Sequence, residues 1–288
     1  PSVYLSVGDI YLSTKRDIQQ ALKYWKEGLE LLIKRKEEFT ELGYRYCQTV
    51  AQILIKRRIY REAQVYAEKT LETAKKIFPD QKHIKIADAY LMVATIHFHI
   101  RNFDKALEGY MQAGQIFNAN PTKYYDQIIS THLAMIEVFG LKGAFDEAKY
   151  LFDKTKDLAL KQYGPNDSRI ADYYYFWAEQ LRFKMQDAKE AKSYFLRALD
   201  IYTQSKETDQ SIFVAIYSNL GSMFFDQGNF DPKNTEEALK YLHECVNQAE
   251  KVGSAASRPL ALACNYLGEI YSLQKNYPES IKFLERGI

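Results

Sequence analysis

Histidine and cysteine are the side chains of this chain best suited to hold a metal or to react with a substrate. Of the five histidines, His97 and His99 are the closest pair in the sequence. Residues two apart on a helix point about 200° away from each other, whereas a shared metal needs a spacing such as i and i+4. We therefore expect no metal site here, and we interpret His97 as an imidazole packed in a core.

No other set of residues has the spacing of a catalytic centre. The sequence contains no phosphate-binding glycine loop, nucleophile elbow or zinc-ligand spacing. Cys47, Cys245 and Cys264 are odd in number and have no metal-binding spacing, which favours buried thiols in a reducing compartment. The sequence thus predicts an intracellular, most simply cytoplasmic, protein that is not an enzyme and that takes no metal, cofactor or small-molecule substrate.

The charge balance gives little attraction for nucleic acid or for anionic membranes. The 288 residues contain 39 Lys and Arg against 37 Asp and Glu, a formal net charge of +2. Residues 15–61 are locally basic, with twelve cations and six acids, which we interpret as solvated helix faces. No apolar stretch is long enough to cross a bilayer, and no signal peptide is visible. We expect neither nucleic-acid binding nor membrane insertion.

The elements that must position these residues follow from one recurring pattern. A small residue recurs at gaps of 42, 43, 42, 43, 47 and 42 residues. These anchors are Ala21, Ala63, Ala106, Ala148, Ala191, Ala238 and Ser280. A second small residue, such as Ala51, Ala94 or Gly268, stands twelve positions before the anchor and lets two helices approach closely. A period of this size indicates stacked helix pairs rather than a closed globule.

Two of the seven units deviate from this pattern. The fifth carries Glu179 at the second small position, and we expect its turn, residues 184–188, to be one residue short. The sixth has an enlarged turn at residues 228–235, which accounts for the gap of 47. We interpret the enlargement as tolerated surface slack, with a recognition loop as the alternative.

The motifs resemble the tetratricopeptide repeat (TPR), which has an aromatic, Leu-Gly and Tyr on its first helix and Ala, an aromatic and Ala on its second. Residues 217–224 and 266–271 match the first motif, and residues 106–113 and 191–198 match the second. The long period and the linkers at residues 78–80 and 163–167 are similar to those of kinesin light chain and nephrocystin-like proteins. The resemblance implies an all-α fold, a right-handed superhelix (α-solenoid) of about seven helix-turn-helix repeats.

We expect a single array whose repeats span residues 1–36, 37–79, 80–120, 121–164, 165–206, 207–252 and 253–288. Terminal repeats normally carry a polar capping helix, and neither end shows one. We therefore expect the chain to be an excerpt of a larger protein.

Five consecutive aromatic residues, 173–177, cover every face of one expected helix. In one interpretation they pack inside the array, which the two-sided burial of TPR helices favours. In the other, some of them present a rigid contact surface to a partner.

The resemblance also implies that the first helices line a concave groove, which holds an extended peptide or a partner helix. Residues at equal phase on these helices share a face. The candidate partner-binding residues are Gln48, Gln52, Asp88, Thr95, Tyr173, Gln180, Asn219, Ser222, Asn265 and Glu269, all expected to face solvent, with Lys56 and Asp226 on the same face. Amides donate and accept together, which suits a peptide backbone, and Asn219 matches a position where the family often has a peptide-clamping asparagine.

These features predict a scaffold or adaptor that binds a protein or peptide without catalysis. Two alternatives remain open, a peptide-gated receptor or sensor module that controls an attached domain and a structural subunit of a large assembly. The two-lysine clamp that some TPR proteins use for a C-terminal carboxylate is not evident in the sequence.

Overall fold

The computed structural model describes residues 1–288 except residues 15, 81, 206–208, 227–230 and 254–256. The described residues form fourteen α-helices and one short π-helix, with no β-strand among them, which confirms the all-α prediction. Contacts divide the chain into two compact units, Pro1–Phe152 (unit 1) and Asp153–Ile288 (unit 2).

Two α-helices lie in each expected repeat range, an odd-numbered A helix and an even-numbered B helix. Unit 1 contains α1 (Ser2–Ser13), α2 (Ile18–Lys34), α3 (Glu41–Lys56), α4 (Tyr60–Ile77), α5 (Ile84–His99), α6 (Phe103–Phe117), α7 (Tyr125–Lys142) and the start of α8 (Phe145–Tyr163). Unit 2 contains the rest of α8, α9 (Ser168–Gln180), the π-helix (Leu181–Met185), α10 (Ala188–Gln204), α11 (Gln210–Asp226), α12 (Pro232–Val252), α13 (Ser257–Leu273) and α14 (Tyr277–Arg286).

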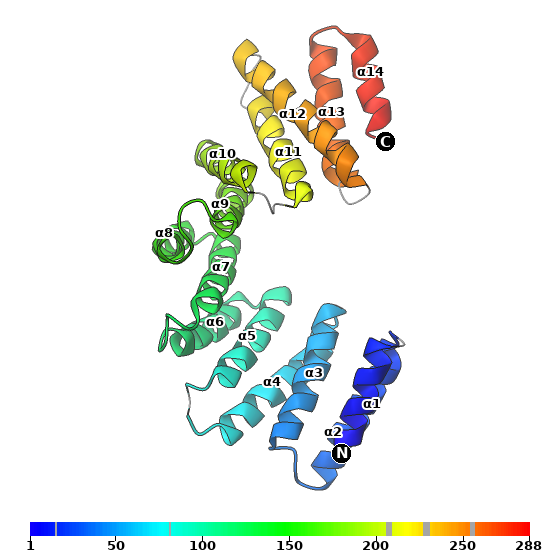
Figure 1. The fold of residues 1–288 in the computed structure, drawn as a ribbon, viewed down its shortest axis with the longest axis vertical. Helices are drawn as coiled ribbons and strands as arrows, with labels where there is room; N and C mark the ends of the chain where they lie inside the picture. Colours follow the sequence, from blue (N-terminus) through cyan, green and yellow to red (C-terminus); the bar gives the residue numbers. More distant parts are fainter. Residues whose placement is uncertain (15, 81, 206–208, 227–230, 254–256) are drawn as a thin grey trace. The chain divides into compact units, whose positions relative to one another are not determined.

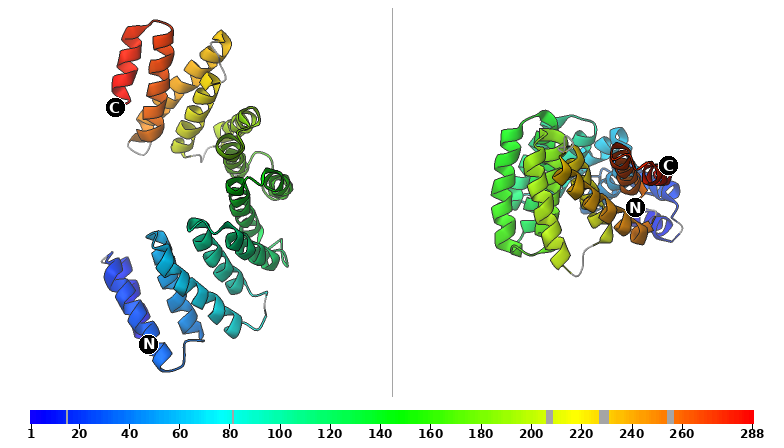
Figure 2. Two further views of the ribbon diagram at one scale, coloured as in Figure 1. Left: turned by 180° about the vertical axis from the view of Figure 1, so that it is seen from behind. Right: turned by 90° about the horizontal axis from the view of Figure 1, so that it is seen from above.

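A helices pack against the B helices that follow them. In unit 1 α1 packs on α2, α3 on α4 and α5 on α6, and in unit 2 α9 packs on α10, α11 on α12 and α13 on α14 (Figures 1 and 2). Neighbouring A helices also contact each other, α3 with α5 in unit 1 and α11 with α13 in unit 2. Each unit therefore has a face made of A helices.

Small residues lie where the A and B helices approach each other most closely. The six alanine anchors are fully buried, and the Ser280 hydroxyl donates to the carbonyl of Gly268 at 2.7 Å. A methyl group on Gly221 would lie 2.6 Å from Leu242, and one on Gly268 would lie 2.5 Å from Leu284. Such distances leave no room for a side chain, which confirms that small residues set the helix spacing.

Six of the turns between A and B helices place one residue in the left-handed region, five positions before the anchor. These residues are Arg16, Arg58, Arg101, Gly143, Gln186 and Lys275, with φ of 50°, 60°, 63°, 75°, 58° and 59°. A left-handed residue ends an α-helix because its backbone turns away from the helical path.

The fifth turn contains one residue more than the third. In the third turn the amide of Asn102 donates to the carbonyl of His97, five residues back, at 2.8 Å. In the fifth the amide of Asp187 donates to the carbonyl of Leu181, six residues back, at 3.0 Å. The π-helix Leu181–Met185 accommodates the extra residue. The prediction that this turn is one residue short is therefore wrong.

The extra residue also moves the small position of the fifth repeat. Ala178, which is fully buried, packs where Glu179 was expected. Glu179 is only partly buried, and its carboxylate accepts a hydrogen bond from the Tyr175 hydroxyl at 2.9 Å.

Residues 228–230 of the enlarged sixth turn lie outside the described residues. In the rest of this turn α12 begins at Pro232, and Asp231 caps its N-terminus. The side chain of Asp231 accepts a hydrogen bond from the amide of Lys233 at 3.1 Å.

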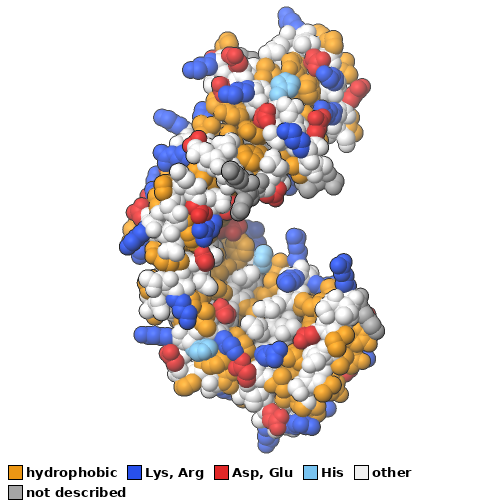
Figure 3. Space-filling view, viewed as in Figure 1, with side chains coloured by type: hydrophobic (Ala, Val, Ile, Leu, Met, Phe, Trp, Pro, Cys, Tyr) orange, Lys and Arg blue, Asp and Glu red, His pale blue; other side chains and the backbone are white. Residues whose placement is uncertain are grey.

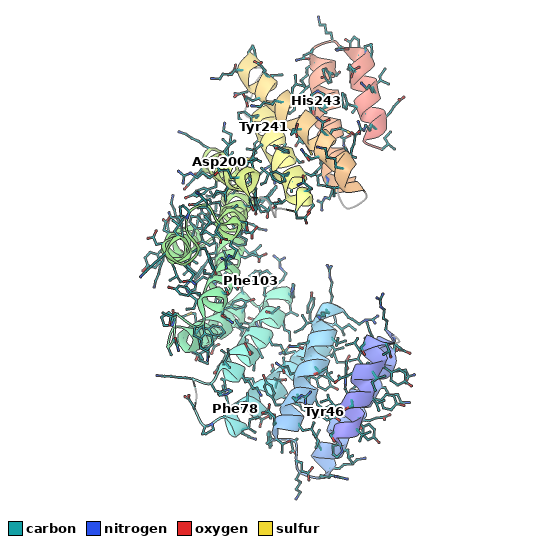
Figure 4. The ribbon with its side chains drawn as sticks, in the orientation of Figure 1. Tyr46, Phe78, Phe103, Asp200, Tyr241 and His243 are labelled. Carbon is teal, nitrogen blue, oxygen red and sulfur yellow. The ribbon has the colours of Figure 1, made fainter. Side chains whose placement is uncertain are left out.

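Aromatic side chains fill the core of both units. In unit 1 Trp25 is fully buried and its indole donates to the carbonyl of Leu5 at 3.2 Å, and Tyr46, labelled in Figure 4, is also fully buried. In unit 2 Tyr241, also labelled, stacks on Phe224 with ring centroids 5.5 Å apart. These aromatic side chains hold the two helices of a pair together in each unit.

The aromatic run at residues 173–177 belongs mainly to this core. Tyr173, Tyr174 and Trp177 are buried, and Tyr175 makes an edge-to-face contact with Phe195 at 5.7 Å. The packing interpretation of the run is therefore confirmed for these four residues.

Candidate interaction surface

Four of the ten candidate residues lie around one hollow on the A-helix face of unit 1. This α3–α5 hollow has a volume of about 520 Å³. Its lining consists of Gln48, Gln52, Ile55, Lys56, Asp88, Leu91, Met92 and Thr95. The candidates Gln48, Gln52, Asp88 and Thr95 come from two A helices that are neighbours in space and a full repeat apart in sequence.

The local sequence explains why these side chains face outward. Ala51 and Ala94 turn inward to the B helices and are fully buried, and the residue directly after each of them, Gln52 or Thr95, lies on the flank of the helix. Gln48 and Gln52 are one helical turn apart and therefore point the same way. The phase argument from the sequence thus brings together the four candidates of unit 1.

The α3–α5 hollow combines an apolar base with polar groups of both kinds. Ile55, Leu91 and Met92 supply the apolar surface, and the two glutamine amides supply donors and acceptors. Lys56 is an exposed cation at one side. Partial burial raises the pKa of Asp88, an effect opposed by the nearby His83. Figure 3 shows apolar, charged and uncharged side chains close together over the visible face of unit 1.

Tyr173 and Gln180, the two candidates on α9, do not face solvent. Their exposed fractions are 2% and 6%, so the expectation of a solvent-facing position is wrong for both. The extra residue of the π-helix turns this part of α9 by one position, about 100°. Asp172 and Glu179, which precede the two candidates, are more exposed and occupy the outward positions.

Ser222, the candidate on α11, is also buried, with an exposed fraction of 3%. The side chain of Arg182 covers Ser222, and its Nη2 donates a hydrogen bond to the Ser222 Oγ at 2.8 Å. Its Nη1 donates to the Oδ1 of Asn219 at 2.5 Å and to the carbonyl of the same residue at 3.2 Å. The acceptor oxygen of the expected clamping asparagine is therefore bound within unit 2.

Sequence reasoning missed Arg182, although a signal for it exists. Arg182 stands four residues after the buried small residue Ala178, where other repeats have Ile55, Phe98 and Phe225. A partly buried cation at a position where several repeats have an apolar side chain needs polar partners, and Arg182 finds them on the next A helix. Burial lowers the pKa of Arg182, while Tyr266, Asp226 and Glu179 oppose that shift.

The two candidates on α13 are exposed but do not share a site. Glu269 lines a hollow of about 700 Å³ together with Phe225, Asp226 and other residues of α11, α12 and α13. Asn265 does not line that hollow, and its Oδ1 would lie 2.7 Å from a methyl group on Gly287.

The remaining chemistry-bearing side chains are packed in the cores. His97 is buried, which confirms its interpretation as a core imidazole. Burial raises the pKa of the Cys47 thiol to about 11 and that of Cys245 to about 12, which disfavours the reactive thiolate. In the part of the chain that the structure describes, no three His, Cys, Asp or Glu side chains are grouped so that they could hold a metal.

Of the helices in the described ranges, none is both long and apolar enough to cross a membrane.

Comparisons with known proteins show what fold this is. No family model and no curated protein matches the chain. Among solved structures, BtubC (BKLC) from P. vanneervenii is 19% identical, with a TM-score of 0.64 over 84% of this chain and 93% of that one. RapI in its apo form is 14% identical, with a TM-score of 0.62 over 99% and 94%. The TPR-like repeats of a putative kinesin light chain from Podosopora anserina are 12% identical, with a TM-score of 0.62 over 72% and 97%. At such identities the likeness shows a shared fold, a solenoid of helix pairs.

Proposed function

We propose that this tetratricopeptide-repeat solenoid is an adaptor, and that the α3–α5 hollow of unit 1 binds an extended segment of a partner protein. One observation carries the proposal. The four candidate residues of unit 1, chosen by helix phase alone, line one hollow of about 520 Å³. A concave site with an apolar base and a few polar groups is the usual form of a binding site.

The spacing of the glutamine amides fits an extended backbone. Gln48 and Gln52 are four residues apart on α3, which corresponds to about 6 Å along the helix axis. An extended chain advances about 6.6 Å in two residues, so its alternate peptide groups can each meet one amide. The side chains between them then point either to solvent or to the apolar base made by Ile55, Leu91 and Met92.

Charge at the hollow would set the direction of the bound segment. Lys56 ends α3, whereas Asp88 lies in the second turn of α5. A segment that places an acidic residue near Lys56 and a donor near Asp88 would gain at both sites, and the reverse order would lose at both. The proposal includes no catalytic step and no cofactor, since none of the lining residues forms a nucleophile–base pair.

A peptide-gated sensor is the second candidate function. A signal-transduction ATPase from Pyrococcus horikoshii, described as having a tetratricopeptide-repeat sensor, is 18% identical, with a TM-score of 0.59 over 99% of this chain and 39% of that one. That likeness supports the idea that an array of this fold can serve as the sensing part of a larger protein. An effect of the bound peptide on the activity of an attached domain would favour the sensor over the adaptor.

The test is a selection of twelve-residue peptides from a phage-displayed library on the full chain. Peptides that use the α3–α5 hollow should bind the double variant Gln48→Ala/Gln52→Ala at least tenfold more weakly, as two lost hydrogen bonds to a backbone predict. Gln115→Ala is the matched control, because Gln115 is an exposed glutamine on the B helix α6. Selected peptides that bind the double variant as tightly as the unmodified chain would place the binding site elsewhere.

A further inference from the structure

A second hollow in unit 1 lies around the turn between α3 and α4. This turn hollow has a volume of about 360 Å³. Its lining comes from the B helices α2 and α4 and from the end of α3, and consists of Gln19, Leu22, Lys23, Lys26, Leu54, Arg57, Ile59 and Glu62. It shares no residue with the α3–α5 hollow.

The turn hollow has an apolar base and a cationic rim. Leu22, Leu54 and Ile59 supply the apolar surface. Lys26 pairs with Glu62 at 2.5 Å, so these two charges largely cancel. Lys23 and Arg57 are exposed, and neither makes an ion pair with any carboxylate that the structure describes. The rim therefore keeps two positive charges that form no ion pair within the described part of the chain.

More cations follow along the turn, outside the lining of the hollow. Arg57 is followed by Arg58, and Arg61 comes three residues later, all of them exposed. Arg58 is in the left-handed region with φ of 60°, where glycine or asparagine is favoured over a long side chain. Like charges placed this close repel one another, and an acidic ligand would relieve that repulsion.

Ile59 is the most unusual residue of the turn hollow. It stands at the N-cap of α4 without a capping hydrogen bond, and its exposed fraction is 42%. Of the corresponding residues, Asp17 and Asp187 accept a capping hydrogen bond, whereas Asn102 and Asn276 are polar but accept none and Ala144 is apolar. A helix start without a polar cap loses about 1 kcal/mol. An exposed isoleucine here therefore lowers the stability of α4 and adds apolar surface to the hollow.

We propose that the turn hollow docks an acidic segment of a partner protein that carries one large apolar side chain. The apolar side chain would lie on Leu22, Leu54 and Ile59, and carboxylates on either side of it would meet Lys23 and Arg57. This site is independent of the α3–α5 hollow, so that either can fail without the other.

The same phage-displayed library tests the proposal. Selection on the full chain should enrich a class of peptides with several Asp or Glu residues around one Leu, Ile, Phe or Trp. A synthetic, fluorescently labelled member of this class should bind at least tenfold more weakly to Lys23→Gln/Arg57→Gln, and its affinity should fall as salt rises, since exposed charges are screened. It should bind Gln48→Ala/Gln52→Ala with unchanged affinity, which separates the two sites.

Ile59→Asn separates binding from folding. Asparagine is native at the corresponding positions Asn102 and Asn276, so the turn accepts this residue and the variant should fold, with a melting temperature close to that of the unmodified chain. It should nevertheless bind the acidic peptide at least fivefold more weakly. Arg101→Gln, the left-handed residue of the third turn, is the matched control and should not change binding.

Three results would overturn the proposal. The first is that no acidic class is enriched, and the second is that the Asn/Gln version of the synthetic peptide binds as tightly as the acidic one. The third is that phosphatidylserine vesicles bind the chain through Lys23 and Arg57 while the acidic peptide does not, which would replace the partner protein by a membrane surface.

Discussion

The A-helix faces of the two units use corresponding positions in opposite ways. In unit 1 Gln52 and Thr95, each directly after the small residue of its helix, border an open hollow. In unit 2 Ser222, at the corresponding place after Gly221, is covered by Arg182. The two units differ four residues after the small residue of the preceding A helix. In unit 1 the apolar Ile55 at this position leaves the hollow open. In unit 2 Arg182 at this position binds Asn219 and Ser222 and covers them.

This comparison shows that helix phase alone does not define a binding position in a repeat array. Phase determines which way a side chain leaves its helix, but the neighbouring A helix decides whether that direction leads to solvent. Asn219 is the clearest case, because its side-chain oxygen is bound by a guanidinium 37 residues earlier in the chain.

Changes to the helix packing that both units share should have the largest effect on stability. They test whether the two units differ only at their A-helix faces. Gly8→Ala in unit 1 and Gly221→Ala in unit 2 should each lower the free energy of unfolding by about 1–3 kcal/mol. The added methyl group would lie 2.2 Å from Trp25 in the first case and 2.6 Å from Leu242 in the second. Urea unfolding followed by circular dichroism measures both losses.

Gly114→Ala on α6 is the control for these two changes. Its added methyl group would have only one neighbour, at 4.0 Å, and replacing a helical glycine by alanine stabilises by about 0.5–1 kcal/mol. If Gly8→Ala or Gly221→Ala proved as stable as Gly114→Ala, the close approach of the helices in that unit would be wrong.

The next effect concerns the part of the A-helix face of unit 2 that Arg182 closes, between α9 and α11. Arg182→Met removes the donors that satisfy Asn219 and Ser222 and should lower the free energy of unfolding by about 1–3 kcal/mol, the usual loss when buried polar groups lose a charged partner. The same variant should leave peptide binding at the α3–α5 hollow unchanged, because that hollow contains no residue of unit 2.

Arg197→Met on α10 provides the comparison for the loss of a charge. Arg197 is exposed and lies over the ring of Tyr194, so its replacement should alter stability by less than about 0.5 kcal/mol. Equal effects of the two arginine variants would show that the hydrogen bonds of Arg182 do not hold the face of unit 2 together.

The parts of the fold that were predictable are those that repeat. The period, the helix pairs and the tight glycines follow from side chains whose spacing recurs along the chain, because each helix pair must bury the same kind of surface. The burial of Tyr173 and Gln180 was not anticipated because one extra residue in the π-helix breaks that recurrence.

A sequence signal for the break does exist. Ile170, Ala171 and Asp172 repeat the order of residues 86–88, and counting from that motif rather than from the anchor assigns the outward position to Asp172 instead of Tyr173. The cover over Ser222 is harder to foresee, since it depends on a contact between two helices and on the length of one arginine.

Introducing an arginine into unit 1, at the position that corresponds to Arg182, tests the contrast between the two faces further. Ile55→Arg places a guanidinium in unit 1 where Arg182 stands in unit 2, four residues after the small residue. It should reach toward Thr95, fill the α3–α5 hollow and weaken peptide binding at least tenfold. Titration calorimetry with a peptide selected for that hollow measures the loss.

Ile55→Leu is the matched control, because it keeps an apolar side chain of the same size and should retain the affinity within about threefold. Peptide binding that survives Ile55→Arg would mean that the ligand does not enter the hollow, and the distinction between an open and a closed face would then have no functional meaning.

The smallest effect is a pH dependence that both units should share. Burial lowers the pKa of His97 in unit 1, helped by Lys105, and burial also lowers the pKa of His243 in unit 2, each from an ordinary value of 6.5. A histidine whose pKa is lower in the folded than in the unfolded chain favours unfolding when protons bind, because the unfolded chain takes them up first. The free energy of unfolding should therefore be fully retained above pH 6.5 and should fall as the pH drops below it.

The histidine variants assign this loss to the units. His97→Gln and His243→Gln should each make the free energy of unfolding less sensitive to pH between 7 and 5, when urea unfolding is measured across that range. The amide of glutamine takes up no proton, so any pH sensitivity that remains belongs to other groups.

His243 also shares a hydrogen bond of 2.8 Å with the Tyr271 hydroxyl, which binds the B helix α12 to the A helix α13. His243→Gln should accordingly lower stability at pH 7 more than His97→Gln does, since the Nδ1 of His97 has no hydrogen-bond partner. The opposite order would show that the imidazole of unit 1, although it lacks that bond, contributes more through packing than the bonded imidazole of unit 2.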